Sequence, residues 1–264
     1  MSIHPTAVVD KAAELAPDVE VGPYAVVGAG VRIGAGTRIG PHSCLEGPLE
    51  IGEQNEIGFS AAIGLGPQIA GSRGLFGAAR IGDRNVFREF TQVHRSREPD
   101  GVTLIGDDNY FMAGAHTAHD CDIGCGVVLC NYVLLAGHVT VGDKAFFAGR
   151  AAMHQFARVG ELAMVGGAAG PAQDIPPYCT AIGVRPCVLT GLNVVGLRRA
   201  GVGAEERRAL KAAYRTLFRS NLPLDERIGR VDATTPEVAK LVDFLRTSER
   251  GVTGFHPFPD RSRD

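Results

Sequence analysis

The feature of this sequence that most restricts its fold is an apolar residue at every sixth position. Stepping by six from Ile3 to Pro171, 26 of the 29 positions hold Ile, Val, Leu, Phe or Met. Because 45% of the chain is hydrophobic, chance would place about 13 such residues there. A strict period of six cannot keep one face of a 3.6-residue helix apolar, so the period excludes amphipathic helices over this stretch.

Each six-residue unit also has a small residue two positions before the large apolar one. The small residues are Ala7, Ala13, Ala25, Ser43, Ala61, Ala115, Cys121, Ala145, Ala151, Ala157 and Ala163. A unit with one large and one small inward side chain cannot bury its apolar face alone, so successive units must stack as a solenoid. The pattern resembles the hexapeptide-repeat proteins. That resemblance implies a mainly β fold, a left-handed parallel β-helix with three six-residue units in each coil.

Two stretches interrupt the repeat. Residues 65–80 and 94–104 are rich in Gly, Pro and charged residues, so we expect both to be extruded loops. After residue 185 the six-residue units stop and helical signals begin. We therefore expect a β-helix over 1–185 and a C-terminal helical region with a polar tail over 186–264.

Two helices are predicted in that C-terminal region. Residues 204–220 place apolar residues at helical spacing, and a second helix begins with Thr235 as N-cap and Pro236 at its first position. The residues expected to be buried are Leu210, Ala213, Tyr214, Leu217, Phe218, Val238, Leu241, Val242 and Leu245.

Charge and composition exclude several function classes. The 27 Lys and Arg residues against 29 Asp and Glu leave a net charge of −2, which removes the electrostatic reason for a nucleic-acid or anionic-membrane partner. No apolar run approaches the roughly 20 residues of a membrane-spanning helix, and the start lacks the pattern of a signal peptide. Six cysteines are too few for a disulfide scaffold of this length. We expect a cytoplasmic protein.

Four of the histidines lie close together in the sequence, namely His116, His119, His138 and His154, and none is at an inward position. With three units in each coil, His119, Gly137 and Gln155 form one column, and His138 lies beside it. A histidine next to a glycine N–H supplies a general base and an oxyanion donor, which is the minimum for acyl transfer.

Two other interpretations of these histidines stay open. They are exposed residues of a repeat surface without chemistry, or His116, His119 and His138 bind zinc as in the γ-class carbonic anhydrases. No His-x-Cys or Cys-x-x-Cys spacing supports zinc. Cys121, Cys125 and Cys130 fall at different offsets of the repeat and are interpreted as packing residues, so we expect no metal.

A series of motifs extends over nearly all of residues 3–250: IGDRNVFREFTQVHR, GAHTAHDC, LAGHVTV, HQF, MVGG, AQDIPPY and GLNVVGLRR. In order and spacing they resemble the UDP-N-acetylglucosamine 3-O-acyltransferases that open lipid A biosynthesis. The resemblance implies transfer of an acyl chain, (R)-3-hydroxyacyl, from the phosphopantetheine of acyl carrier protein to the sugar 3-hydroxyl. It also implies a homotrimer with active sites between subunits and no bound cofactor.

The resemblance assigns the catalytic roles to three residues. His119 matches the general base, Asp120 the carboxylate that orients it, and Gly137 the oxyanion donor. Neighbours on an extended strand point to opposite faces, so a contact between His119 and Asp120 requires a local bend of the backbone.

The resemblance also implies binding roles. His116, His138 and Gln155 match residues lining the sugar and acyl sites, and Asn193 and Arg199 match residues that engage the acyl donor or the nucleotide diphosphate. Gly167 matches the position that measures acyl length, where a missing side chain leaves room for a longer chain. Arg185, where the family usually has His, is assigned to acyl length as well.

One loop departs from the family pattern. The family holds the nucleotide-sugar with an Asp and a Lys, and this chain has Ile69 and Gly71 there, with Gln68 and Arg73 as the nearby polar substitutes. Two alternative functions therefore remain. One is the same transfer to a different UDP-sugar, such as a 3-amino analogue, and the other is a non-catalytic paralogue that binds the acyl donor or the nucleotide-sugar.

Overall fold

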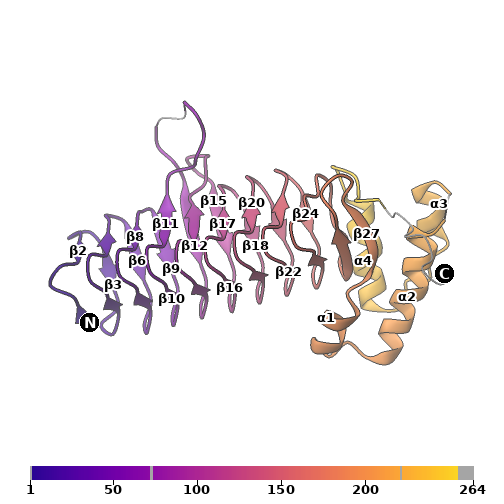
Figure 1. Ribbon diagram of the computed structural model, residues 1–264, viewed down its shortest axis with the longest axis horizontal. Coiled ribbons are helices and arrows are strands. Elements are labelled where there is room, and N and C mark those ends of the chain that lie inside the picture. The colour runs from indigo at the N-terminus through magenta and orange to yellow at the C-terminus, as the bar shows by residue number, and fades with distance from the viewer. Residues whose placement is uncertain (1, 72–73, 221, 255–264) are drawn as a thin grey trace, which may run out of the picture.

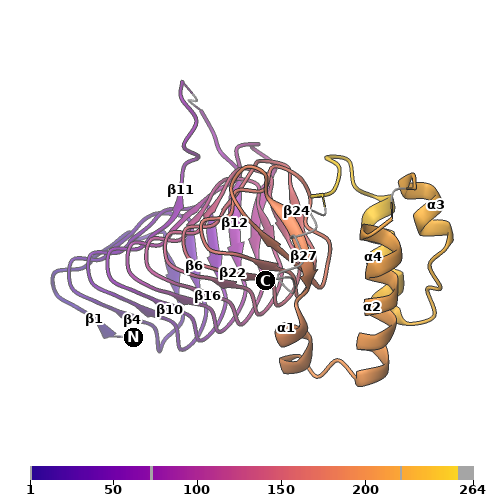
Figure 2. The same cartoon turned by 45° about the vertical axis from the view of Figure 1, so that its right-hand side comes forward.

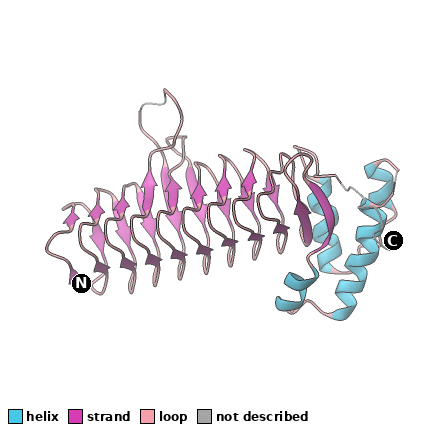
Figure 3. Ribbon diagram, viewed as in Figure 1, coloured by secondary structure: helices cyan, strands magenta, loops and turns pink. Residues whose placement is uncertain are grey.

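Short parallel strands wind into a long prism, and a group of helices follows at its C-terminal end (Figures 1 and 3). The computed structural model describes residues 2–71, 74–220 and 222–254. Arg73 and the expected polar tail from residue 255 lie outside the described residues. Each coil contributes one strand to each of three sheets, which we call A, B and C.

Sheet A has 11 strands and sheets B and C have eight each. Sheet A consists of β1 (Ser2–Ile3), β4 (Glu20–Val21), β7 (Arg38–Ile39), β10 (Glu56–Ile57), β13 (Val86–Phe87), β16 (Tyr110–Phe111), β19 (Val128–Leu129), β22 (Phe146–Phe147), β25 (Met164–Val165), β26 (Cys179–Ile182) and β27 (Val188–Leu192). Sheet B consists of β2 (Val8–Val9), β5 (Val26–Val27), β8 (Cys44–Leu45), β11 (Ala62–Leu65), β14 (Gln92–His94), β17 (His116–Thr117), β20 (Leu134–Leu135) and β23 (Ala152–Met153). Sheet C consists of β3 (Glu14–Leu15), β6 (Val31–Ile33), β9 (Leu49–Ile51), β12 (Ala78–Ile81), β15 (Val102–Ile105), β18 (Asp122–Ile123), β21 (Thr140–Val141) and β24 (Arg158–Val159).

The strand register confirms three six-residue units in each regular coil, since Glu20 pairs with Arg38 and Arg38 with Glu56. Two coils are longer: Glu56 pairs with Val86, five units on, and Val86 with Tyr110, four units on. The surplus units form the two expected loops, one between β11 and β12 and one between β14 and β15. The first rises from the prism beside β11 (Figure 2). Because both surpluses are whole numbers of units, the apolar period keeps its phase across them.

The inward positions of the repeat form the core, as the period predicts. Phe87, Phe111 and Phe147 are fully buried at large positions, and Ala115 and Cys121 are buried at small ones. Leu75 keeps the phase of the period but lies in the first loop and is 86% exposed, so it is not a core residue.

A ladder of polar side chains runs inside the prism at the corner between sheets C and A. Thr37 Oγ1 accepts from the Asn55 N–H, Asn55 Oδ1 from the N–H and side-chain amide of Asn85, and Asn85 Oδ1 from the Asn109 N–H. All four side chains are buried. The ladder ends on the next coil, where the corresponding residue is Val127. Its N–H donates to Asn109 Oδ1, but its side chain has no polar atom to continue the ladder. Among the described residues, Asn109 Nδ2 has no partner.

The C-terminal region begins with a strand rather than a helix. The six-residue units end before residue 186, as expected, but Val188–Leu192 forms β27, which pairs antiparallel with β26. The helices follow: α1 (Val194–Arg199), α2 (Ala204–Phe218), α3 (Leu224–Gly229) and α4 (Pro236–Arg246). The helices of the C-terminal region therefore begin at Val194, after this strand.

The two predicted helices are confirmed as α2 and α4. All nine residues expected to be buried on them are buried. Thr235 caps α4, because its side chain accepts from the Val238 N–H at 3.3 Å. No helix in the described part of the chain is long and apolar enough to cross a membrane.

Candidate active site

His119 and Asp120 lie in the turn between β17 and β18, at the corner where sheet B meets sheet C. His119 Nδ1 and Asp120 Oδ2 are 2.7 Å apart. Asp120 has a φ of 60°, which is the backbone bend that the contact requires. A carboxylate accepts only, so in the neutral ring the Nδ1–H donates to Asp120 and Nε2 has the lone pair.

The Asp120 carboxylate is held by further donors from the second loop. Ser96 Oγ donates to Oδ1, and the Arg97 N–H donates to Oδ2 at 3.2 Å. The Asp120 N–H in turn donates to Thr103 Oγ1 at 2.8 Å. Burial acts to raise the pKa of Asp120, but the hydrogen bonds from Ser96, His119 and Arg97 outweigh it and lower this pKa below its usual value.

Gly137 lies directly beneath the His119 ring. A Cβ at residue 137 would come within 2.5 Å of Cε1 and 2.7 Å of Nε2 of His119, so only glycine allows this approach. Backbone bonds from His138 to His119 and from Phe156 to Gly137 stack the three coils here. Within the described residues, no hydrogen bond uses the Gly137 N–H.

His138 completes the corner on the next coil. Its Nε2 lies 3.6 Å from Asp120 Oδ2, and its ring meets that of His119 edge to face at 5.2 Å. Phe156 stacks on the other face of the His138 ring at 4.5 Å and 11°. His138 and Phe156 have φ values of 60° and 63°, like Asp120 one coil before.

His116 lies on the outer face of sheet B beside His94, with ring centroids 5.1 Å apart. His116 Nδ1 is 3.2 Å from Gln92 Oε1, and His94 Nδ1 donates to the Gly66 carbonyl at 2.8 Å. Burial, and to a lesser degree the neighbouring His94, lowers the pKa of His116 to about 4. Burial also lowers the pKa of His94. The pair is therefore uncharged at neutral pH.

The sequence reasoning missed His94, Ser96, Arg97 and Thr103, which all surround the predicted dyad. The length of the second loop could have revealed them. The coil that contains this loop has four six-residue units instead of three, so Ser96 lies under Asp120 and Gln92 pairs with His116, each 24 residues on. Counting three units in every coil leads to the wrong partners.

Four other predicted residues line two separate grooves. Gln155 and Arg185 line one of about 610 Å³ that starts at Ala136, next to the dyad. Asn193 and Arg199 line another of about 720 Å³, together with Phe146 and other residues of sheet A. Asn193 also caps α1, since its Oδ1 accepts from the Gly196 N–H at 3.0 Å. A single chain does not bring the Asn193 groove to His119.

Gly167 is exposed, and a Cβ added there would meet nothing closer than the Gly149 carbonyl at 3.6 Å. Gln68 is exposed on the first loop. Gly71 has a φ of 76°, a conformation that favours glycine.

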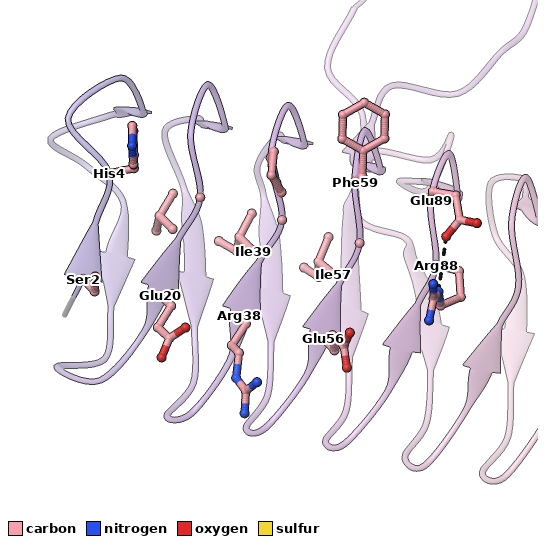
Figure 4. Close-up of a pocket in the computed structure, with 15 residues that line it drawn as sticks. Ser2, His4, Glu20, Arg38, Ile39, Glu56, Ile57, Phe59, Arg88 and Glu89 are labelled. Carbon is pink, nitrogen blue, oxygen red and sulfur yellow. Dashed lines mark hydrogen bonds and ion pairs between the residues drawn. The ribbon is translucent and has the colours of Figure 1, made fainter.

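A further groove lies on the N-terminal part of sheet A (Figure 4). It has about 560 Å³ and carries Glu20, Arg38 and Glu56 on successive strands. No residue expected in the active site lines it.

Within the described residues, one set of side chains could hold a metal ion, namely His119, Asp120 and His138, whose ligand atoms lie within 4.8 Å of one another. His116, which the zinc interpretation included, is not part of it. The hydrogen bond to Asp120 occupies Nδ1 of His119, so Nε2 is the nitrogen of this residue that has a lone pair in the neutral ring. Cys121 is buried, but Cys125 is exposed and accepts the Asp107 N–H at 3.3 Å, so Cys125 is not a packing residue.

Comparison with known proteins identifies similar sequences and structures over most of the chain. Residues 174–253 match the family described as UDP-N-acetylglucosamine O-acyltransferase, domain 2. A curated acyl-(acyl-carrier-protein)–UDP-N-acetylglucosamine O-acyltransferase from Anaeromyxobacter sp. strain K is 45% identical over 174 residues, covering 64% of this chain and 67% of the relative. LpxA from Acinetobacter baumannii is 36% identical, with a TM-score of 0.90 over 95% of this chain and 99% of that one.

The chain belongs to the UDP-N-acetylglucosamine O-acyltransferase family.

Membership in the UDP-N-acetylglucosamine O-acyltransferase family confirms the resemblance that the motifs indicated, and with it an acyltransferase activity. A second solved member of the family, LpxA from Moraxella catarrhalis, has a TM-score of 0.91 at 38% identity and covers 96% of this chain and 100% of that one. The left-handed β-helix expected from the repeat is thereby confirmed.

Proposed function

We propose that the protein transfers an acyl chain, (R)-3-hydroxyacyl, from acyl carrier protein to the 3-hydroxyl of UDP-N-acetylglucosamine, the first step of lipid A biosynthesis. One observation carries the proposal: Asp120 fixes the His119 ring directly over a side-chain-free Gly137. This arrangement puts a base with a free Nε2 next to an N–H donor on the outside of the prism.

In the proposed reaction, Nε2 of His119 takes the proton of the sugar hydroxyl as the oxygen attacks the thioester carbonyl. The Gly137 N–H donates to the carbonyl oxygen while it carries negative charge. The new C–O bond remains when the C–S bond breaks, and the thiolate receives the proton from the His119 imidazolium. His119 returns to its neutral form with Nδ1 still on Asp120, and no external redox partner or metal is needed.

We propose that the protein acts as a homotrimer. His119 is at the corner between sheets B and C, while Asn193 and Arg199 line a groove against sheet A. These groups can share one substrate only if a neighbouring chain supplies one of the two sets.

The three faces of the prism differ in a way that supports this assembly. The outward side chains of sheet B include no acidic residue, and their only basic residues are His94 and His116: Val8, Val26, Cys44, Ala62, Gln92, His94, His116, Leu134 and Ala152. From β13 to β25, sheet A presents Val86, Tyr110, Val128, Phe146 and Met164. Sheet C instead has an ion-pair ladder of Glu14, Arg32, Glu50 and Arg80. Sheets A and B are thus suited to burial in a closed ring, and sheet C to solvent.

The corner between sheets A and B supports the same arrangement. Tyr24, Phe90 and Tyr132 lie there and are 58%, 52% and 61% exposed. Large exposed aromatic side chains of this kind are typical of a surface that a partner covers.

We propose that acyl carrier protein approaches over α2. A groove of about 410 Å³ there shares Leu192 and Val194 with the Asn193 groove. It is lined by five basic residues, Arg207, Arg208, Lys211, Arg215 and Arg219. This charge suits the phosphodiester of phosphopantetheine and an acidic carrier surface. We also propose a cytoplasmic location, which the six free cysteines support.

Product analysis tests the proposed function. The protein is incubated with (R)-3-hydroxyacyl carrier proteins of several chain lengths and either UDP-N-acetylglucosamine or its 3-amino analogue, and the products are identified by mass spectrometry. We expect the 3-O-acyl product. Product only from the 3-amino analogue would replace the proposed sugar, and no product from any pair would support the non-catalytic paralogue.

Substitution of His119 tests the base. His119→Ala should lower turnover by about 10²- to 10⁴-fold, the usual contribution of a general base. His4→Ala, which removes an exposed histidine on the first coil, serves as the matched control. If His119→Ala keeps more than a tenth of the activity, another residue is the base.

A further inference from the structure

We propose that Ser96 is a positioning residue, which holds the Asp120 carboxylate so that Oδ2 faces His119. This inference rests on the proposed function only where kcat is measured, because the test of the His119 tautomer needs no substrate. It adds a group that neither the motifs nor the comparisons point to, since Ser96 lies in the second loop, outside the six-residue repeat.

The two oxygens of Asp120 are held from opposite sides. Ser96 Oγ donates to Oδ1, while His119 Nδ1 and the Arg97 N–H both donate to Oδ2, at 2.7 and 3.2 Å. Within the described residues no other donor reaches Oδ1. Without the Ser96 hydroxyl the carboxylate is free to turn about its terminal torsion, which is broad and roughly two-fold.

Turning the carboxylate has a specific cost because a second histidine competes for it. His138 Nε2 lies 3.6 Å from the same Oδ2. The tautomer of a neutral imidazole is set by the hydrogen bonds that its two nitrogens make. A carboxylate shared loosely between two histidines would therefore hold the Nδ1 proton of His119 less firmly.

The second loop is built around the Ser96 hydroxyl. The Ser96 N–H donates to the Ala78 carbonyl, and its carbonyl accepts the Gly77 N–H, each at 3.1 Å. Its Oγ accepts the Glu98 N–H at 3.0 Å, and a Cβ at Gly101 would come within 2.2 Å of Oγ. Ser96 is fully buried, so it does not touch the substrate and can act only through Asp120.

A double-mutant cycle with a matched control tests the proposal. We expect Ser96→Ala to lower kcat by about 10- to 100-fold with KM for the sugar nucleotide within twofold. In an Asp120→Asn background the same change should lower kcat by less than about threefold, because the carboxylate it positions is already lost. Ser43→Ala is the control: Ser43 is also fully buried, with Oγ donating to the Gly58 carbonyl, but lies in the core far from His119.

A kcat loss that is equal in both backgrounds, or equally large in Ser43→Ala, would overturn the proposal, because it would show a general effect on folding. A loss below about threefold for Ser96→Ala would overturn it too.

A spectroscopic readout needs no substrate. In protein labelled with 15N-histidine, NMR should show His119 as the Nδ1–H tautomer in the wild type and in Ser43→Ala, with a smaller Nδ1–H fraction in Ser96→Ala. An unchanged tautomer in Ser96→Ala would refute the Ser96 role. If the wild-type protein transfers no acyl chain to any sugar, the proposed function fails, and the tautomer still decides the role of Ser96.

Discussion

Two neighbouring histidines beside the dyad, His94 and His116, are uncharged at neutral pH because burial lowers the pKa of both. Their rings therefore form an uncharged, hydrogen-bonding surface beside His119, the residue that must accept a proton in the proposed reaction. It also couples the stability of the fold to pH.

His116 should make the protein less stable in acid. Its pKa is about 4 in the folded protein and about 6.5 in the unfolded chain, so between these values the unfolded chain binds a proton that the folded protein does not. The free energy of unfolding should therefore fall as the pH drops from 6.5 towards 4. Urea unfolding at pH 7 and pH 5 measures this loss, which should be smaller in His116→Gln. The pH effect should be unchanged in the control His4→Gln, and an equal loss in wild type and His116→Gln would contradict the assignment.

At the same scale, the sequence predicted the dyad but not its surroundings. His119, Asp120 and Gly137 follow from the repeat and the motifs, and the necessary bend is supplied by the φ of 60° at Asp120. The donors from Ser96 and Arg97 could not be predicted, because their stacking depends on how many residues the second loop adds. The sequence also could not predict the φ of 76° at Gly71, because an isolated glycine adopts either sign of φ.

At the scale of elements, the asparagine ladder ties four coils together independently of the apolar core. Asn85 is its central member: its N–H and its side-chain amide both donate to Asn55 Oδ1, and its Oδ1 accepts from the Asn109 N–H. Replacing it by alanine leaves the Asn109 N–H without its acceptor and removes one of the two donors to Asn55 Oδ1, which keeps the backbone N–H of residue 85.

We therefore expect Asn85→Ala to lower the free energy of unfolding by about 1–3 kcal/mol, the usual cost of one buried unsatisfied group. Asn131→Ala, which removes the same group from an exposed turn, is the control and should change stability by less than about 0.5 kcal/mol. Chemical denaturation measures both. Equal stability of Asn85→Ala and Asn131→Ala would show that water replaces the ladder at no cost.

Most elements were predictable because the repeat determines them. The strands fall at the apolar positions, and α2 and α4 follow from helical spacing and the Thr235 cap. β27 was missed because its pairing is antiparallel and its residues no longer repeat with a period of six. The ladder was missed because its members Thr37, Asn55, Asn85 and Asn109 are unevenly spaced, at three, five and then four six-residue units.

At the scale of the whole molecule, the three faces of the prism have different chemistry, and the proposed trimer follows from that difference. Light scattering should give a particle of three times 27.8 kDa. A single glutamate on sheet B should weaken the assembly, because it would place an unpaired charge in an uncharged interface.

Val26→Glu and Leu104→Glu test this with matched positions. Both are outward strand residues, 42% and 39% exposed in the single chain, the first on sheet B and the second on sheet C. We expect Val26→Glu to shift the particle towards the monomer mass and to lower activity with it, while Leu104→Glu leaves both unchanged. A trimer that is equally stable in both variants would exclude sheet B from the interface.

The catalytic corner has one more consequence. Asp120, His138 and Phe156 occupy consecutive left-handed turns, each of which costs an L-residue roughly 1 kcal/mol or more that glycine would not lose. Glycine at these three turns would relieve the backbone, but it would remove the Asp120 carboxylate, the His138 ring and the Phe156 ring stacked on it. The corner is therefore a place where selection for thermal robustness and selection for turnover act in opposite directions.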